Sequence, residues 1–321
     1  NIVPIIYQPG SVNIRMNPPN LAVDLGGLTL KNPVIAASGT FGYGGEFSSF
    51  YDINCLGALV TKGLSLEPAP GNPPPRTVET CGGMINAIGL ENVGFEAFVE
   101  KKLPFLQSLN TAVIVNLYGK RMEDYGELAR RIDPLEGIAG IELNVSCPNV
   151  KAGGMAFGTD PEMAYAVTRV VRDQTDLPLI VKLSPNVTDI AAVARRVEKA
   201  GADALSLINT ISAMAVDVNT RKPKLGNTMG GLSGPAIKPI ALGMVWKTAR
   251  SVDIPVIGIG GIMNAADALE FLIVGATAVQ IGTANLVNPK AGHEIVEGLR
   301  SYLEAHGLGD IREIIGSLEE R

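Results

Sequence analysis

The sequence predicts a (β/α)8 barrel, in which eight parallel strands alternate with helices, and three observations support this fold. Eight short apolar runs are spaced along the chain, as expected for strands that helices cover on both faces. A polar residue or a glycine follows each run. The 321 residues also suit one such barrel, which commonly takes ~250 residues, together with an extension and long loops. The runs are residues 34–37, 58–61, 112–115, 140–143, 179–181, 204–208, 255–259 and 278–281.

The segments before the first run are predicted to lie outside the barrel proper. Residues 1–20 are rich in asparagine and proline and are expected to form an extended N-terminal arm. Residues 21–30 carry apolar residues on both sides of Asp24-Leu-Gly-Gly27, which predicts a hairpin. This hairpin would plug the N-terminal mouth of the barrel, and residues 21–321 would form one domain.

Helix signals and insertions fill the intervals between the runs. Asp160 before Pro161 is a cap followed by proline at the first helical position, which predicts the start of a helix. Thr188 and Asn264 are expected to begin two more helices, which would end near Gly201 and Gly275. Residues 67–76 hold five prolines and are predicted to be irregular, because proline removes a backbone donor. Residues 211–234 form a second long insertion. Both would lie over the active-site face, where such loops are usually functional.

Composition excludes several classes of protein. Apolar residues make up 46% of the chain and charged residues 18%, which is typical of a soluble protein with a large core. The net charge of −5 argues against nucleic acid or an anionic membrane as a partner. No apolar run approaches the ~20 residues that span a bilayer. Cys55, Cys81 and Cys147 are far apart and lack metal-ligand spacing, so we expect no metal site and a reduced, cytoplasmic setting.

Glycines end the seventh and eighth runs. Gly260 and Gly261 follow the seventh, and Gly282 and Thr283 follow the eighth. Barrels of this type often bind phosphate at this place, on backbone N–H groups. Taken alone, each pair could be an ordinary tight turn, but two adjacent turns favour a phosphate site. The pattern is neither a Walker loop nor a dinucleotide fingerprint, so it favours a mononucleotide.

Two lysines end buried strands. Lys62 follows the second run and Lys182 follows the fifth. Strand interiors avoid lysine unless it is paired, and a merely solvated lysine would have to lie on the barrel mouth. Two ammonium groups at this mouth therefore predict an anionic ligand, an anionic intermediate, or both.

Asparagines are concentrated at the strand ends and in the adjoining loops. Each offers two donors and one acceptor without adding charge, so the set suits a planar ligand with alternating N–H and C=O groups, such as a pyrimidine. Individually, each could instead form a turn. The set comprises Asn86, Asn92, Asn116, Asn144, Asn149 and Asn209.

Cys147 is the leading candidate for a proton acceptor. It follows the fourth run and precedes a proline, so we expect it to face the mouth. The two histidines, His293 and His306, belong to the C-terminal helical region. The alternative is that Cys147 is a small apolar core residue, as we expect of Cys55.

Together these residues resemble the dihydroorotate dehydrogenase family, and within it the class 1B catalytic subunits. The resemblance extends from residues 32–42 to residues 282–283 and is most specific at residues 61–63, 71–76, 86–92 and 142–149. Residues 150–154, Val-Lys-Ala-Gly-Gly, resemble class 1B rather than the fumarate-using class 1A. Cysteine at position 147 differs from the serine that membrane-associated class 2 enzymes use. The arm, residues 1–20, lies outside the resemblance.

The resemblance implies a reaction, a cofactor and a partner. Members bind FMN, here one per chain, and oxidise dihydroorotate to orotate in de novo pyrimidine biosynthesis. Class 1B implies a homodimer joined by an electron-transfer subunit that carries FAD and a [2Fe–2S] cluster, which gives a heterotetramer that reduces NAD. Residues 21–321 would then be a single FMN-binding barrel domain.

The resemblance also assigns roles to residues. Cys147 would remove the proton from C5 of dihydroorotate while hydride leaves C6 for flavin N5. The FMN-binding residues would be Ser38, Lys62, Gly63, Asn116, Asn144, Lys182, Ile208, Gly234, Gly260, Gly261, Gly282 and Thr283. The substrate-binding residues would be Lys62, Asn86, Ala87, Ile88, Gly89, Leu90, Asn92, Asn144, Asn209 and Thr210.

Three alternatives stay open at this point. The same reaction could use fumarate or another acceptor, as in class 1A. A flavin-free, phosphate-binding lyase or isomerase could use Lys62 or Lys182 as a Schiff-base lysine. A non-catalytic flavin-binding subunit could only relay electrons.

Overall fold

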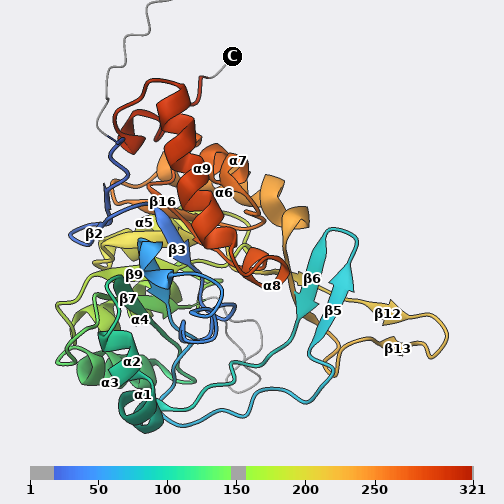
Figure 1. Ribbon diagram of the computed structural model, residues 1–321. Helices are drawn as coiled ribbons and strands as arrows, with labels where there is room; N and C mark the ends of the chain where they lie inside the picture. Colours follow the sequence, from blue (N-terminus) through green and yellow to red (C-terminus); the bar gives the residue numbers. More distant parts are fainter. Residues whose placement is uncertain (1–17, 146–156, 320–321) are drawn as a thin grey trace, which may run out of the picture.

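The computed structural model describes residues 18–145 and 157–319. Its centre is a closed barrel of eight parallel strands (Figure 1). In order around the barrel these are β3 (Val34–Ala36), β4 (Ala58–Val60), β7 (Ala112–Leu117), β8 (Gly140–Asn144), β9 (Leu179–Lys182), β10 (Ala204–Leu207), β15 (Val256–Ile259) and β16 (Ala278–Ile281), which pairs with β3. Every predicted run forms one of these strands, so the predicted barrel is confirmed.

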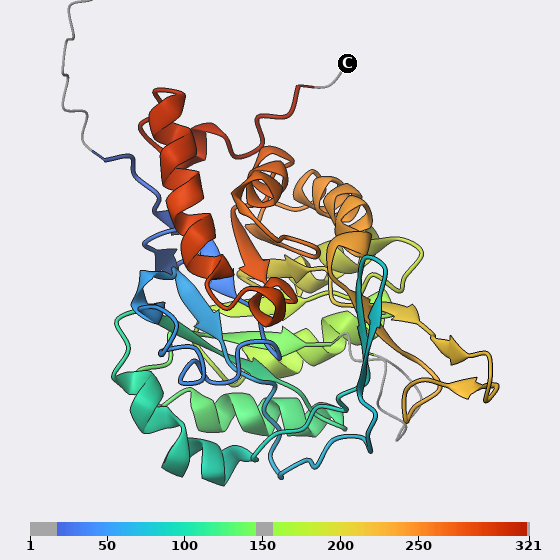
Figure 2. The same ribbon diagram turned by 45° about the vertical axis from the view of Figure 1, so that its right-hand side comes forward.

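Helices pack around the barrel and bury one face each against it (Figures 1 and 2). They are α1 (Phe95–Lys101), α2 (Leu103–Gln107), α3 (Met122–Ile132), α4 (Pro161–Arg172), α5 (Ile190–Lys199), α6 (Lys238–Ala249), α7 (Ala265–Ile273), α8 (Ala284–Val287) and α9 (Ala291–Ala305), with 3-10 turns η1 (Ile53–Cys55), η2 (Pro235–Ile237) and η3 (Ile311–Glu313). None of the helices in the described ranges has the length and apolarity needed to cross a membrane.

Side-chain caps explain where three of these helices begin. The predicted caps Asp160 and Asn264 accept hydrogen bonds from backbone N–H groups in the first turns of α4 and α7. The predicted start of α5 at Thr188 is displaced by one residue. Asp189 is the cap there, because its carboxylate accepts the N–H of Ala191, and aspartate is favoured over threonine at such positions.

The predicted N-terminal hairpin is present and packs against the N-terminal end of the barrel. Strands β1 (Val23–Asp24) and β2 (Thr29–Leu30) pair antiparallel. Leu25, between them, is fully buried. Gly26 has a φ of 68°, and a Cβ there would lie 2.3 Å from the carbonyl oxygen of Asp203, one residue before β10. The tight turn of this plug therefore requires glycine.

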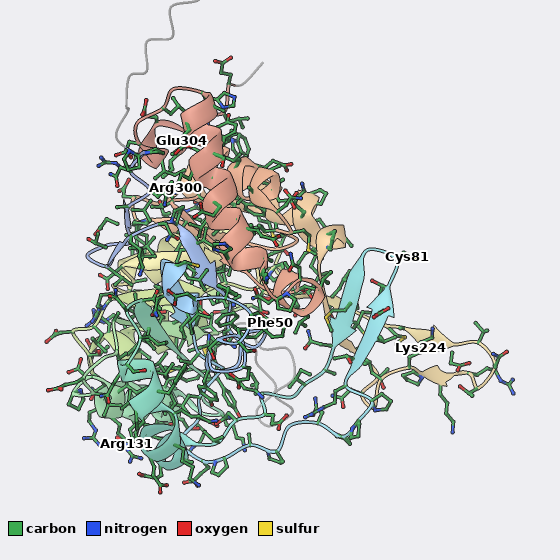
Figure 3. The ribbon with its side chains drawn as sticks, viewed as in Figure 1. Phe50, Cys81, Arg131, Lys224, Arg300 and Glu304 are labelled. Atoms are coloured by element: carbon green, nitrogen blue, oxygen red, sulfur yellow. The ribbon has the colours of Figure 1, made fainter. Side chains whose placement is uncertain are left out.

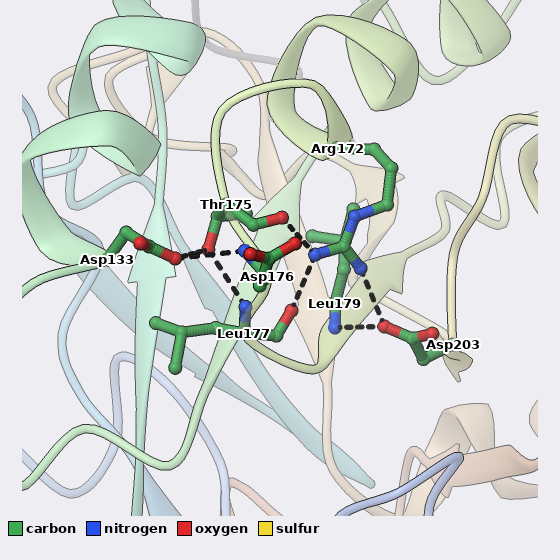
Figure 4. Close-up of polar contacts among 7 residues, drawn as sticks. All are labelled: Asp133, Arg172, Thr175, Asp176, Leu177, Leu179 and Asp203. Atoms are coloured by element: carbon green, nitrogen blue, oxygen red, sulfur yellow. Dashed lines mark hydrogen bonds and ion pairs between the residues drawn. The ribbon is translucent and has the colours of Figure 1, made fainter.

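A polar network joins the loop after α4 to the starts of β9 and β10, at the end of the barrel opposite the strand C-termini (Figure 4). The Asp203 carboxylate accepts hydrogen bonds from Arg172 and from the N–H of Leu179, both at 2.8 Å. Thr175 donates to Asp133, which follows α3, at 2.6 Å. Polar groups at this end of a barrel usually serve stability rather than catalysis.

The insertion at residues 211–234 pairs with the segment that follows the proline-rich residues 67–76, and together they form a second sheet. β5 (Thr77–Thr80), β6 (Gly83–Asn86), β11 (Ile211–Ala213) and β14 (Gly230–Ser233) pair antiparallel in the order β11-β14-β6-β5. β12 (Val216–Asp217) and β13 (Lys222–Pro223) extend this region as a hairpin arm. Figure 3 shows Cys81 at the β5–β6 turn and Lys224 on the arm, both away from the barrel. Residues 67–76 contain no helix or strand beyond an isolated bridge at Ala69, as their prolines predict.

Candidate active site

The C-terminal ends of all eight barrel strands border one pocket of about 450 Å³. Such a volume is typical of a small-molecule or cofactor site. Parallel strands place their C-terminal ends at the same mouth, which explains how residues far apart in sequence meet. In strand order the pocket is lined by Ser38, Lys62 and Gly63, Asn116, Asn144, Lys182, Ile208 and Asn209, Gly260 and Gly261, and Gly282 and Thr283.

The inserted sheet and its loops form the roof of this pocket. They contribute Arg76, Thr77, Met84, Asn86, Ile88, Gly89, Leu90, Glu91, Thr210, Gly231, Ser233 and Gly234. The roof is tied to β16, because the Thr283 hydroxyl donates to Ser233 Oγ at 2.8 Å. Leu90 has a φ of 58°, a conformation that non-glycine residues rarely adopt. Such backbone strain clusters at functional sites.

A buried carboxylate organises the polar floor of the pocket. Glu142 on β8 is fully buried. Its Oε1 accepts a hydrogen bond from Asn116 Nδ2 at 2.7 Å and lies 3.6 Å from Lys182 Nζ. Its Oε2 accepts from Ser206 Oγ at 2.9 Å and from Gln280 Nε2 at 2.6 Å. A buried charge is tolerated when it is paired and hydrogen-bonded, so this cluster fixes Lys182 and Asn116 at the floor.

The rim of the pocket carries two cations and one carboxylate. Arg76 donates to Glu91 at 2.7 Å, and Lys62 Nζ lies 3.9 Å from the same oxygen. The Arg76 hydrogen bond and then the Lys62 charge hold the pKa of the Glu91 carboxyl below its usual range. Glu91 therefore compensates only part of the positive charge, and the Lys62 side chain keeps 29% of its surface exposed. An anionic ligand would complete the charge balance.

The glycine side of the pocket has room for a phosphate. Gly234, Gly260 and Gly261 have φ values of 96°, 130° and 74°. At Gly261 a Cβ would lie 2.8 Å from the Cβ of Lys238. At Gly282, by contrast, the nearest atom to a Cβ would be 3.9 Å away. The backbone here borders open space in front of the short helix α8, the arrangement in which barrels of this type hold phosphate.

The structure places most, but not all, of the predicted site residues at this pocket. Ala87 and Asn92 lie outside the pocket lining. Ala87 is buried beside Ile85, whereas the Asn92 amide donates to Ser65 Oγ and the carbonyl of Leu90, so it shapes the loop behind the pocket. Cys147 and Asn149 lie outside the described residues.

Neither of the two described cysteines has the surroundings predicted for a proton acceptor. Cys55 is half-buried, and burial above all raises the pKa of its thiol to about 11. It packs against the core, in agreement with the prediction. Cys81 is exposed at the β5–β6 turn, away from the barrel (Figure 3).

Two groups of residues at the site were not predicted from the sequence: Glu142 with its partners Ser206 and Gln280, and the rim pair Arg76 and Glu91. Ser206 and Gln280 stand inside otherwise apolar strands, and a buried polar side chain requires a partner. That signal was available in the sequence. Arg76 and Glu91 gave no comparable signal, because exposed charges are common in loops.

The sequence of the chain matches the model of the dihydroorotate dehydrogenase family over residues 20–303. It is 59% identical over 303 residues to the dihydroorotate dehydrogenase B (NAD(+)), catalytic subunit, of Geotalea uraniireducens, which covers 94% of this chain and 99% of that protein. The proteins of the same name from Citrifermentans bemidjiense and Geobacter sulfurreducens are 57% and 59% identical over 304 residues, 95% of this chain and 100% of each relative. The chain therefore belongs to the dihydroorotate dehydrogenase family of oxidoreductases.

Proposed function

We propose that the chain is the FMN-binding catalytic subunit of a class 1B dihydroorotate dehydrogenase, which oxidises dihydroorotate to orotate in pyrimidine biosynthesis. The observation that best supports this function is a single pocket at the C-terminal ends of the eight barrel strands. This pocket combines glycines, two lysines and a set of amides. The relatives from Geotalea and Citrifermentans support the NAD-linked class, because both are named dihydroorotate dehydrogenase B (NAD(+)).

FMN fits the residues of the pocket. The glycine side offers backbone room for its phosphate. Oδ1 of Asn116 is buried and has no hydrogen-bond partner among the described residues, which leaves an acceptor for a flavin N–H. Ser38, Lys62, Gly63, Asn144, Lys182, Ile208 and Gly234 would complete the cofactor site, with Gly260, Gly261, Gly282 and Thr283 at the phosphate. When bound, FMN supplies the acceptor for the hydride that leaves C6 of dihydroorotate.

The substrate would be held under the roof. Lys62 would pair with the carboxylate of dihydroorotate, and its position at the rim beside Arg76 suits an anion. Asn86, Ala87, Ile88, Gly89, Leu90, Asn92, Asn144, Asn209 and Thr210 would bind the ring or shape the loops that do. Cys147, three residues beyond β8, would take the proton from C5. A thiol does this only if its pKa is lowered or if the proton moves with the hydride.

Anaerobic addition of dihydroorotate to the purified chain tests this function. A flavin absorption band that bleaches on titration supports it. A colourless chain that binds phosphate compounds would instead indicate a flavin-free lyase or isomerase. A coloured chain that dihydroorotate does not bleach would indicate a subunit that only relays electrons.

The two pocket lysines are expected to differ in their effects. Lys182→Ala should lower the reduction potential of FMN or its retention, because the buried ammonium lies beside the cofactor site and its loss leaves Glu142 unpaired. Lys62→Ala should also weaken orotate binding, because this more exposed lysine is assigned to both ligands. FMN content, potentiometry and orotate titration measure these effects. Unchanged values in both variants would refute both assignments.

Electrons are expected to leave through another protein. The sequence has no cysteine cluster for an iron–sulfur centre, which typically needs about four ligands, and no dinucleotide fingerprint. The isolated chain should reduce artificial acceptors with dihydroorotate and NAD poorly. Adding a partner that carries FAD and a [2Fe–2S] cluster should restore NAD reduction. Efficient NAD reduction by the chain alone would contradict this, and efficient fumarate reduction would assign it to class 1A.

The proposed assembly follows from the same class. Two copies of this chain would form a homodimer, and two electron-transfer subunits would complete a heterotetramer. Residues 21–321 would act as one FMN-binding domain after an arm at residues 1–20. Three scattered cysteines are consistent with a reduced, cytoplasmic setting.

A further inference from the structure

The buried carboxylate beneath the pocket has no role in the proposed function. We infer that Glu142 is a positioning residue that offsets the Lys182 charge and thereby lowers the reduction potential of the bound flavin. This inference rests on the proposed FMN site. It concerns a residue that does not itself line the pocket, whereas its partners Asn116 and Lys182 do.

The position of Glu142 in the barrel supports a role beyond packing. Side chains from four other strands contact its two oxygens: Asn116 from β7, Lys182 from β9, Ser206 from β10 and Gln280 from β16. One carboxylate therefore fixes the floor of the pocket across more than half of the barrel. All five residues are at least nine-tenths buried.

The charges of the floor bear directly on a redox cofactor. A flavin gains negative charge on reduction, so a nearby cation favours the reduced form. Lys182 is the cation of this floor, and Glu142 lies 3.6 Å from it. Charges buried in a protein interact more strongly than charges in water and are little screened by salt. Glu142 therefore opposes the effect of Lys182 on the flavin, and without it Lys182 would present its full charge.

The amides around the carboxylate show how the floor depends on it. Oδ1 of Asn116 and Oε1 of Gln280 are buried without a hydrogen-bond partner in the described part of the chain, while both NH₂ groups donate to Glu142. Glu142 thus sets which atom of the Asn116 amide is left for a ligand. The same arrangement makes Glu142→Gln a tolerable substitution, because a flipped amide at Gln280, outside the pocket lining, accepts the new N–H and leaves Asn116 unchanged.

Glu142→Gln is therefore the first variant, and Ser206→Ala is its matched control. Both alter the hydrogen bonds of the same cluster, but only the first changes the charge. We expect potentiometry of the FMN-loaded protein to show a higher flavin potential in Glu142→Gln, with a reduced-to-oxidised ratio at fixed potential raised on the order of tenfold. The potential of Ser206→Ala should stay at the parent value. Glu142→Asp, which keeps the charge, should also keep the potential near the parent value.

A double variant separates the effect of charge on the flavin potential from the effect of a structural change. Lys182→Met should lower the potential, and Glu142→Gln with Lys182→Met should return it toward the parent value, since the two charges cancel. The double variant also avoids an unpaired buried charge, so it is expected to fold even if Glu142→Gln alone does not.

Two results would overturn the inference. In the first, Glu142→Gln and Ser206→Ala shift the potential equally. In the second, the double variant keeps the low potential of Lys182→Met. Either result would leave the proposed function standing if dihydroorotate bleaches the parent protein. Failure of that bleaching in the parent protein would instead refute the function itself.

Discussion

Cys147→Ala is expected to keep bound FMN and to lose flavin reduction by dihydroorotate by a factor of about 10²–10⁴, the usual effect of removing a general base. The residue follows β8 and Glu142 in sequence. Alanine removes the sulfur without adding bulk, so the described cofactor site should be unaffected. Anaerobic stopped-flow absorbance at the flavin band measures the loss.

Cys81→Ala is the matched control for this prediction. Cys81 is exposed at the β5–β6 turn, away from the barrel, so its removal should leave flavin reduction unchanged. Near-normal reduction by Cys147→Ala would remove Cys147 from the mechanism. An equal loss in both variants would indicate a general effect of removing thiols.

Gly261→Ala is expected to weaken FMN binding by about 100-fold, since its combined penalty is about 2–4 kcal/mol. The backbone at Gly261 has a φ of 74°, which disfavours a side chain. The new Cβ would lie 2.8 Å from the Cβ of Lys238 and 2.9 Å from the carbonyl oxygen of Gly234. Relief of these contacts would displace the turn after β15, where we place the FMN phosphate.

Gly243→Ala provides the control for this substitution. Gly243 lies within α6, and a Cβ there would meet nothing within 4 Å. Alanine in a helix is favoured over glycine by about 0.5–1 kcal/mol, so FMN affinity should stay unchanged and the protein should unfold at a slightly higher temperature. Fluorescence titration of the apoprotein with FMN compares the two variants. Equal FMN affinities in the two variants would show that the FMN phosphate does not bind beside Gly261.

The barrel could be predicted from the sequence because its strands are buried on both faces. A run such as residues 278–281 is apolar apart from Gln280, and a short, nearly continuous apolar run is typical of a parallel strand that helices cover on both sides. The residues after each run then follow from the geometry of parallel strands. This is why Lys62, Asn116 and Lys182 could be predicted to share one mouth.

The roof and the Glu142 cluster could not be predicted in the same way. β6 and β14 pair with each other across a long stretch of sequence, and neither has the apolar alternation of an isolated strand. Glu142, Ser206 and Gln280 lie on three separate strands, and each has apolar residues on both sides in the sequence. Their meeting depends on the rotation of each side chain into the barrel, which local sequence does not specify. The catalytic role of Cys147 stays a prediction, since this residue lies outside the described residues.

The pairing of the roof strands also bears on how the chain folds. Asn86 donates to the carbonyl of Gly231, a contact across 145 residues, and the intervening chain contains β7, β8, β9 and β10. Closing so large a loop is entropically unfavourable until that chain is compact, and contacts of this range slow folding. We therefore expect the intervening strands β7 to β10 to assemble before the roof forms, which makes cofactor retention a late property of a newly synthesised chain.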